Sequence, residues 1–172
     1  MNTSMRFLAC VVLTAALGQA ERTIAQETAA PATATTPAQP AALASTDGEL
    51  PGLRAEVTEL KRGGSVVTLK FTLINDSSEA FSFGYDMGDP AMSTIDFGAI
   101  GGVHLIDNEG KKKYQVIRDA NKKCVCSGGL KDLQPQSRMT LWARFPAPPA
   151  DVESVSIMIP HFIPMDGVPF SQ

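Results

Sequence analysis

Apolar and polar residues alternate along much of the chain beyond residue 50, with the period of two that half-buried β-strands show. The clearest example is residues 65–74 (SVVTLKFTLI). Val67, Leu69, Phe71 and Leu73 fall on one face of this predicted strand, because successive side chains of a strand point to opposite faces. The segment therefore predicts a strand with one buried face.

Shorter versions of the pattern predict further strands. They cover residues 53–60, 80–84, 102–107, 113–118, 138–145 and 154–159. Turn-forming clusters such as KRGG (61–64), NDSS (75–78) and DNEG (107–110) separate them. Short, evenly spaced strands of this kind favour an all-β fold, an antiparallel β-sandwich of about seven to eight strands. Trp142 is most simply a residue of its core.

The N-terminal residues have a different pattern. Residues 7–18 (FLACVVLTAALG) form an uncharged apolar run of signal-peptide length, whereas a bilayer-spanning helix needs about 20 residues. Small residues favour cleavage after Ala20 or, as an alternative, after Ala25. We therefore expect residues 1–20 to be a signal peptide that leaves no transmembrane segment once it is cleaved.

A low-complexity segment follows. Residues 27–45 contain almost only Ala, Thr, Pro and Gln, which bury too little apolar surface to offset ordering, so residues 21–49 are predicted to be a disordered linker. Residues 50–172 suffice for one domain with a core. We expect that domain to be exported, to the periplasm or to the extracellular space. The net charge of −3 gives no argument for binding nucleic acid.

Three stretches of the domain carry a family resemblance. They are residues 102–107 (GVHLID), 111–127 (KKKYQVIRDANKKCVCS) and 141–162 (LWARFPAPPADVESVSIMIPHF). In this order they resemble a bacterial exported immunoglobulin-like domain, of the kind found alone or preceding OmpA-like peptidoglycan-binding domains. The resemblance implies an immunoglobulin-like sandwich in the cell envelope and no particular activity. Peptidoglycan binding belongs to the second domain of those proteins and is not carried over.

The cysteines are the most distinctive candidate chemistry. Cys10 lies in the predicted signal peptide, which leaves Cys124 and Cys126 as an even pair that export would oxidise. On a regular strand such residues lie about 6–7 Å apart, which is too far for a disulfide. A bond therefore requires a tight local bend, which Gly128 and Gly129 favour. We expect a structural disulfide that fixes a turn.

Two other chemistries remain open as alternatives. Lys122 and Lys123 would stabilise a thiolate next to the cysteine pair, which favours thiol–disulfide exchange. Thioether and imidazole groups suit Cu(I). The candidate copper ligands are Met87, Met92, Met139, Met158, Met165, His104 and His161.

Charge is unevenly distributed within the domain. Residues 71–110 contain seven acids and no Lys or Arg, whereas residues 111–131 contain seven bases and one acid. The simplest interpretation is that the two segments are neighbours whose charges cancel. The alternative is a basic face for an anionic polymer. Its candidate residues are Lys111, Lys112, Lys113, Arg118, Lys122 and Lys123.

No motif of a known enzyme class accompanies these features, and neither histidine lies near a plausible nucleophile in the sequence. The sequence therefore predicts a non-enzymatic cell-envelope module without a cofactor, which recognises an envelope protein or an anionic polymer. The alternative is a periplasmic thiol-redox or copper-handling protein.

Overall fold

The computed structural model describes residues 41–85, 87–92 and 94–171; the predicted signal peptide and most of the predicted linker lie outside them. In the described part, no helix is long and apolar enough to cross a membrane. The elements, in chain order, are β1 (Ala44–Asp47), β2 (Leu53–Gly63), β3 (Val66–Asn75), the short 3-10 helix η1 (Pro90–Met92), β4 (His104–Asp107), β5 (Lys112–Gln115), β6 (Ser137–Pro146), β7 (Ser154–Met158) and β8 (Met165–Pro169).

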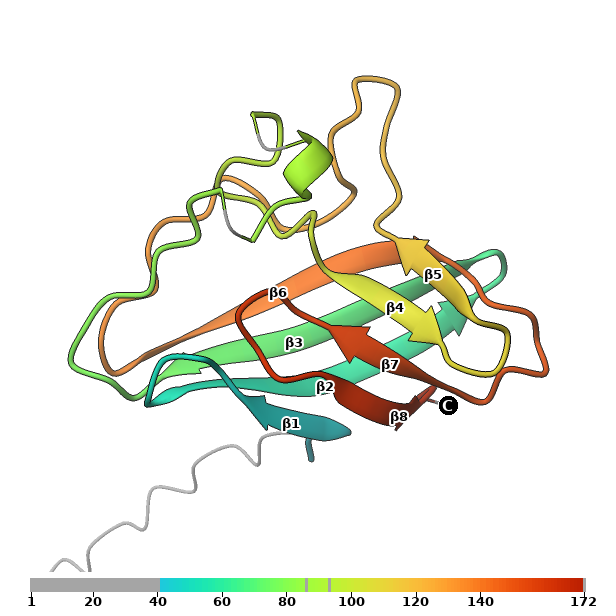
Figure 1. The fold of residues 1–172 in the computed structure, drawn as a ribbon, viewed down its shortest axis with the longest axis horizontal. Helices are drawn as coiled ribbons and strands as arrows, with labels where there is room; N and C mark the ends of the chain where they lie inside the picture. The colour runs from blue at the N-terminus through green and yellow to red at the C-terminus, as the bar shows by residue number, and fades with distance from the viewer. Residues whose placement is uncertain (1–40, 86, 93, 172) are drawn as a thin grey trace, which may run out of the picture. The chain divides into compact units, whose positions relative to one another are not determined.

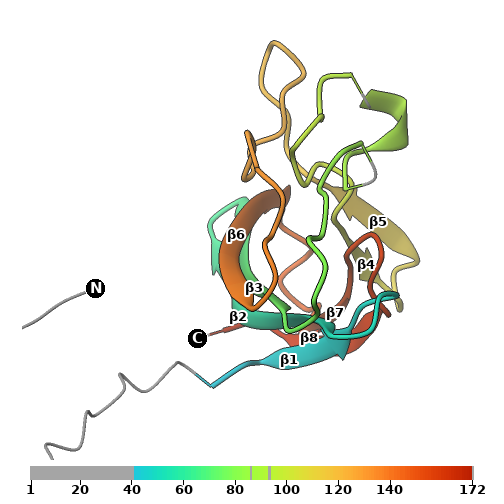
Figure 2. The same cartoon turned by 90° about the vertical axis from the view of Figure 1, so that its left-hand side faces the viewer.

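The strands form two antiparallel sheets that pack as two layers (Figures 1 and 2). One sheet has the order β1-β2-β3-β6 and the other the order β5-β4-β7-β8. The chain changes sheet between β3 and β4, between β5 and β6, and between β6 and β7. In immunoglobulin nomenclature β2-β3-β6 correspond to strands A, B and E, and β5-β4-β7-β8 correspond to C′, C, F and G. The predicted all-β fold, an antiparallel β-sandwich of about seven to eight strands, is therefore confirmed, with eight strands in two sheets of four.

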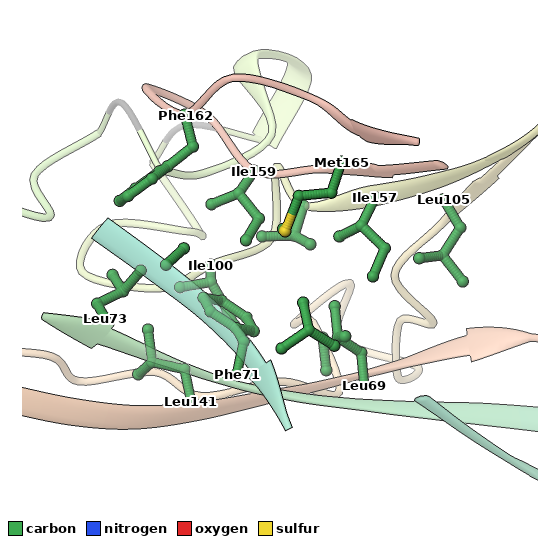
Figure 3. Packing of buried hydrophobic residues seen from close by; sticks show 14 of the residues in the cluster. Leu69, Phe71, Leu73, Ile100, Leu105, Leu141, Ile157, Ile159, Phe162 and Met165 are labelled. Carbon is green, nitrogen blue, oxygen red and sulfur yellow. The ribbon is translucent and has the colours of Figure 1, made fainter. Parts of the chain in front are cut away.

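The core lies between the inner faces of the sheets. Val67, Leu69, Phe71 and Leu73 of β3 are fully buried, as their alternation predicts. Figure 3 shows Leu69, Phe71 and Leu73 facing side chains of the opposite sheet such as Leu105 and Ile157. Burial of this apolar surface is the main favourable contribution to folding.

A bulge explains where the alternation along β2 breaks. Leu53, Ala55 and Val57 point inward, but Glu59 occupies the next position of that series. The register between β2 and β3 shifts between Val57 and Glu59, so that Leu60 takes the inward position instead. One extra residue thus keeps the carboxylate out of the core.

The prediction that Trp142 is a core residue was wrong. Leu141, Ala143 and Phe145 are the buried residues on this part of β6, so the period of two directs Trp142 outward, where it is 40% exposed. The guanidinium of Arg144, on the same outer face, lies 5.9 Å from the centroid of the Trp142 ring. The size of the tryptophan does not override the alternation set by its neighbours.

The strand boundaries differ from the predictions in three places. Ala44–Asp47 pair with β2, so the domain begins earlier than the predicted boundary at residue 50. Residues 80–84, predicted to be a strand, contribute only the single bridge between Phe81 and Leu133. β8 was not predicted, because Gly167 and Pro169 interrupt its pattern.

Candidate functional site

The two longest connections of the domain come together at one end of the sandwich. Residues 76–103 connect β3 to β4, and residues 116–136 connect β5 to β6. Both rise beyond the end of β5 in Figure 1 and reach the top of the view in Figure 2. We call the described residues within 84–103 and 117–130 the loop cap.

Main-chain hydrogen bonds join the two loops. The N–H of Leu130 donates to the carbonyl of Gly98 at 2.8 Å. Closer to the sheets, Phe81 and Leu133 each donate to the carbonyl of the other, at 2.9 and 2.8 Å. The two loops therefore form one folded unit rather than two independent loops.

A buried ion pair lies at the centre of the loop cap. The side chain of Asp96 is only 1% exposed, and it receives both terminal nitrogens of Arg118. Nη1 donates to Oδ1 at 2.9 Å and Nη2 to Oδ2 at 2.7 Å. This two-pronged geometry is the strong form of a carboxylate–guanidinium contact. It connects a residue of the acidic segment of the sequence to one of the basic segment.

Further partners complete the pair. The main-chain N–H of Asp89 donates to Asp96 Oδ2 at 3.0 Å, and the Asp89 carboxylate lies 3.5 Å from Arg118 Nη2. Nη1 of Arg118 also donates to the carbonyl of Lys122 at 2.7 Å. Arg118 therefore holds the tip of its own loop as well as the loop opposite.

The surroundings of Asp96 determine how it titrates. Burial on its own would raise the pKa of Asp96, but the hydrogen bonds from Arg118 and from the Asp89 N–H, together with the charge of Arg118, outweigh it and hold the pKa below the usual aspartate value. The native state thus favours the ionised carboxylate more than the unfolded chain does. The resulting stabilisation is present above the unfolded pKa and is lost as pH falls through the folded pKa.

Close backbone contact around Asp96 requires glycine. A β-carbon at Gly101 would lie 2.0 Å from Asp96 Oδ2, and one at Gly102 would lie 2.4 Å from the carbonyl oxygen of Gly88. The chain can wrap this tightly around the carboxylate only because these positions have no side chain.

Residues next to the cysteines connect the two sheets. Just after β5, the N–H of Ile117 donates to the carbonyl of Arg144 on β6 at 2.8 Å. The N–H of Val125 donates to Ile117 O at 2.7 Å, and Val125 O accepts the N–H of Arg144 at 3.1 Å. Ser127 continues the pairing, since its N–H donates to Trp142 O at 2.8 Å. This segment covers the outer edge of β6, which would otherwise expose unpaired main-chain groups.

The structure joins Cys124 and Cys126 by a disulfide, with the sulfurs 2.01 Å apart. Their Cα atoms are 5.3 Å apart, less than on a regular strand, so the required local bend is present. Both residues are half-buried and pack against the core cluster. The disulfide therefore brackets Val125, the residue that bridges the sheet edges.

Two aromatic side chains project from the loop cap. Tyr85 is 55% exposed and Phe97 is 59% exposed, and their ring centroids lie 4.7 Å apart. Ile95, on the other side of Asp96, is also exposed. We call these three residues the aromatic patch. They present apolar surface to solvent, and two of them flank Asp96 in the sequence.

The six predicted anion-binding residues belong to different parts of the fold. Lys111, Lys112 and Lys113 lie where β5 begins, whereas Lys122 and Lys123 lie in the turn beyond its other end. Arg118 lies between these groups and is engaged by Asp96. The acidic and basic segments are neighbours, since β4 pairs with β5 and Arg118 contacts both Asp89 and Asp96.

The candidate copper ligands are spread over the domain. Met87 and Met165 are buried in the core, and His161 Nδ1 lies 3.1 Å from a carboxylate oxygen of Glu49. His104 and Met158 face each other across β4 and β7. Within the described ranges, no group of three or more His, Cys, Asp or Glu side chains is placed to hold a metal ion.

Sequence reasoning did not single out Asp96, Tyr85 or Phe97. The one available signal was the separation of acidic and basic segments, which indicates that the segments meet but not which residues pair. Pairing of Asp96 with Arg118 depends on the path of two loops that are separated by two strands. Local sequence patterns carry no information about that path.

Comparisons with protein-family models, with curated proteins and with solved structures gave no match. The candidate site is therefore assessed from its own geometry.

Loss of the Asp96–Arg118 ion pair is expected to destabilise the domain. Arg118→Met leaves Asp96 as an uncompensated buried charge and is expected to lower the free energy of unfolding by about 3 kcal/mol at pH 7. Lys123→Met, in the same loop but exposed, is expected to change it by less than about 0.5 kcal/mol. Urea unfolding of both variants measures the difference. Equal stability of the two variants would contradict the central role of the pair.

The Cys124–Cys126 disulfide predicts how many free thiols the native protein contains. Thiol titration of the native mature chain, from which Cys10 has left with the predicted signal peptide, is expected to find no free thiol. Two thiols are expected after reduction of the unfolded protein. Two reactive thiols in the untreated native protein would rule out a structural disulfide.

Proposed function

We propose that this protein is a non-enzymatic binding module of the cell envelope, and that its loop cap recognises a protein partner. The observation that carries the proposal is the exposed aromatic patch of Tyr85, Ile95 and Phe97 on a loop that the Asp96–Arg118 pair holds in place. Aromatic residues are enriched at protein interfaces and dominate their binding energy.

The position of Asp96 explains why this patch suits recognition. Ile95 and Phe97 flank Asp96 directly in sequence, so the anchored carboxylate restrains the main chain from which both project. A surface ordered before binding loses less conformational entropy on association. The ion pair thus supports affinity without touching the partner.

A protein partner fits the loop cap better than an anionic polymer does. Arg118 is engaged by Asp96. The lysines form two groups, Lys111–Lys113 at the start of β5 and Lys122–Lys123 in the turn beyond its other end. A polymer of negative charge requires a continuous basic surface. The aromatic patch, in contrast, supplies apolar area in one place.

Several features support export to the envelope. The sequence predicts a signal peptide and a linker that would extend the reach of the domain. A disulfide persists in oxidising compartments. The family resemblance of residues 102–107, 111–127 and 141–162 supports the same location.

The thiol-redox and copper alternatives have less support. The segment that contains Cys124 and Cys126 is hydrogen-bonded to β6, which favours a structural role. His161 and Met165, the candidate ligands closest in sequence, have different environments, since Met165 packs in the core.

The proposal is tested by capture of the partner. Phe97→Ser and Tyr85→Ser are each expected to lower the affinity for a protein captured from envelope extract of the producing cells at least about tenfold, the effect of losing about 1.4 kcal/mol at an interface centre. Leu50→Ser, on the β1–β2 turn and similarly exposed at 54%, is the matched control and should leave the affinity unchanged.

All three side chains are exposed, so the thermal midpoints should remain close to that of the unaltered protein. If the Phe97 and Tyr85 variants retained full affinity, or if Leu50→Ser weakened binding to the same extent, the loop cap would not be the recognition surface.

A further inference from the structure

We propose that the free edge of β5 is a second interaction surface, which binds an acidic, extended segment of a partner protein by adding it as a strand. This inference does not depend on the function of the loop cap. It rests on three features: the main-chain groups of β5, a groove beside them, and the lysines Lys111, Lys112 and Lys113.

The edges of β6, β1 and β2 are covered in part. β8 ends the same sheet as β5 at its other side, but Met165–Pro169 include no lysine. Val125 and Ser127 pair with the outer edge of β6. On the far side, residues 161–171 cover the edges of β1 and β2: the N–H of Ile163 donates to Asp47 O at 3.2 Å, and the N–H of Ser171 donates to Leu60 O at 2.7 Å. β5 ends its sheet, and no strand of the described chain pairs with its outer side.

The main chain of β5 presents hydrogen-bonding groups on that side. Along a strand, the N–H and C=O of successive residues point to alternate edges. The N–H of Ile117 points away from β4, because it donates to Arg144 O on β6. Lys113 and Gln115 lie four and two residues before Ile117. Their main-chain N–H and C=O groups therefore also face away from β4. They are the groups that an added strand would pair with.

A groove runs along this edge. Its volume is about 460 Å³, and it is lined by Lys112, Lys113, Tyr114 and Gln115 of β5 and by Pro146 and Ala147 at the end of β6. The two strands meet at Ile117 and Arg144 and are not paired along the groove. The groove therefore gives a bound strand space for side chains next to the free main-chain groups.

Charge identifies the occupant as acidic. Lys111, Lys112 and Lys113 are exposed, and none of them belongs to an ion pair among the described residues. Asp107, which faces Lys112 across the hairpin, is buried and accepts the N–H of Gly110 at 2.8 Å. The lysines are thus free to pair with carboxylates of an added strand.

The same lysines disfavour pairing with a second copy of this chain. Antiparallel addition of one β5 edge to another in the register that places Lys113 opposite Lys113 would bring the lysines of both copies together. Like charges facing one another across strands are destabilising, and edge lysines commonly prevent such self-association. The surface is therefore selective for a partner of opposite charge.

The test uses an acidic peptide of alternating Glu and Val residues as the probe, with a peptide carrying Lys in place of Glu as its control. NMR titration at low ionic strength should show saturable shifts of the Lys113 and Gln115 amides with the acidic peptide alone. Absence of saturable shifts up to about 1 mM peptide would overturn the proposal, as would shifts confined to the loop cap.

Backbone and charge variants separate the two contributions. Gln115→Pro removes an N–H that faces away from β4, so the hairpin should persist while affinity falls at least tenfold, or about 1.4 kcal/mol. Gln115→Ala keeps the N–H and should bind within about twofold of the unaltered protein. If Gln115→Pro unfolds, the triple change of Lys111, Lys112 and Lys113 to Gln tests the same site without altering the backbone. Unchanged affinity in that variant would overturn the proposal.

Self-association is the remaining outcome. Concentration-dependent dimerisation that is abolished by Gln115→Pro but retained in Gln115→Ala would assign the edge to a second copy and overturn the proposal. Failure here is distinct from failure of the loop-cap function, because none of these variants alters Tyr85, Ile95 or Phe97.

Discussion

A single buried carboxylate governs the end of the sandwich on which the proposed recognition depends. Asp96 lies away from water, so its charge is tolerable only while Arg118 and the Asp89 N–H contact it. The contact of Arg118 with Asp96 holds the β5–β6 loop against the β3–β4 loop. The main chain at nearby glycines packs closely around the pair. The exposed side chains of Ile95 and Phe97 are held by the same anchor. Met87 and Ile100 of the first loop and Leu130 of the second also pack in or against the core, so core packing and the ion pair hold the loops together.

The cysteine segment has a complementary role at the side of the domain. Val125, between the two cysteines, bridges the end of β5 to the edge of β6, and the disulfide fixes the bend that allows this contact. The small ring constrains little of the unfolded chain, so its effect is local geometry rather than global stability. Where this bridge ends, the sheets separate and the edge of β5 remains open. One covered edge, that of β6, and one open edge, that of β5, therefore lie side by side, and Lys112 and Lys113 belong to the open one.

Sequence patterns predicted the framework because strand burial is a local, period-two property. The inward series on β3 and the turn after Asp107 needed only neighbouring residues. The same logic failed for Trp142, where residue size was weighed above the alternation of Leu141 and Ala143. β1 was missed because Ala44–Asp47 are strand-forming only through pairing with β2. The Asp96–Arg118 pair could not be predicted for a different reason. It depends on how two loops fold, and the separation of acidic and basic residues indicated only that the two segments attract each other.

Carbon-detected NMR titration of the Asp96 carboxylate tests the central claim most directly, because it observes the buried group itself. The account predicts that the pKa of Asp96 lies below the usual aspartate value in the native protein, since Arg118 and the Asp89 N–H outweigh burial. It also predicts that the pKa rises above the usual value once Arg118 is replaced by Met, because burial then acts without a compensating charge. A native Asp96 that titrates at or above the usual aspartate value, or one whose pKa does not respond to loss of Arg118, would contradict the account.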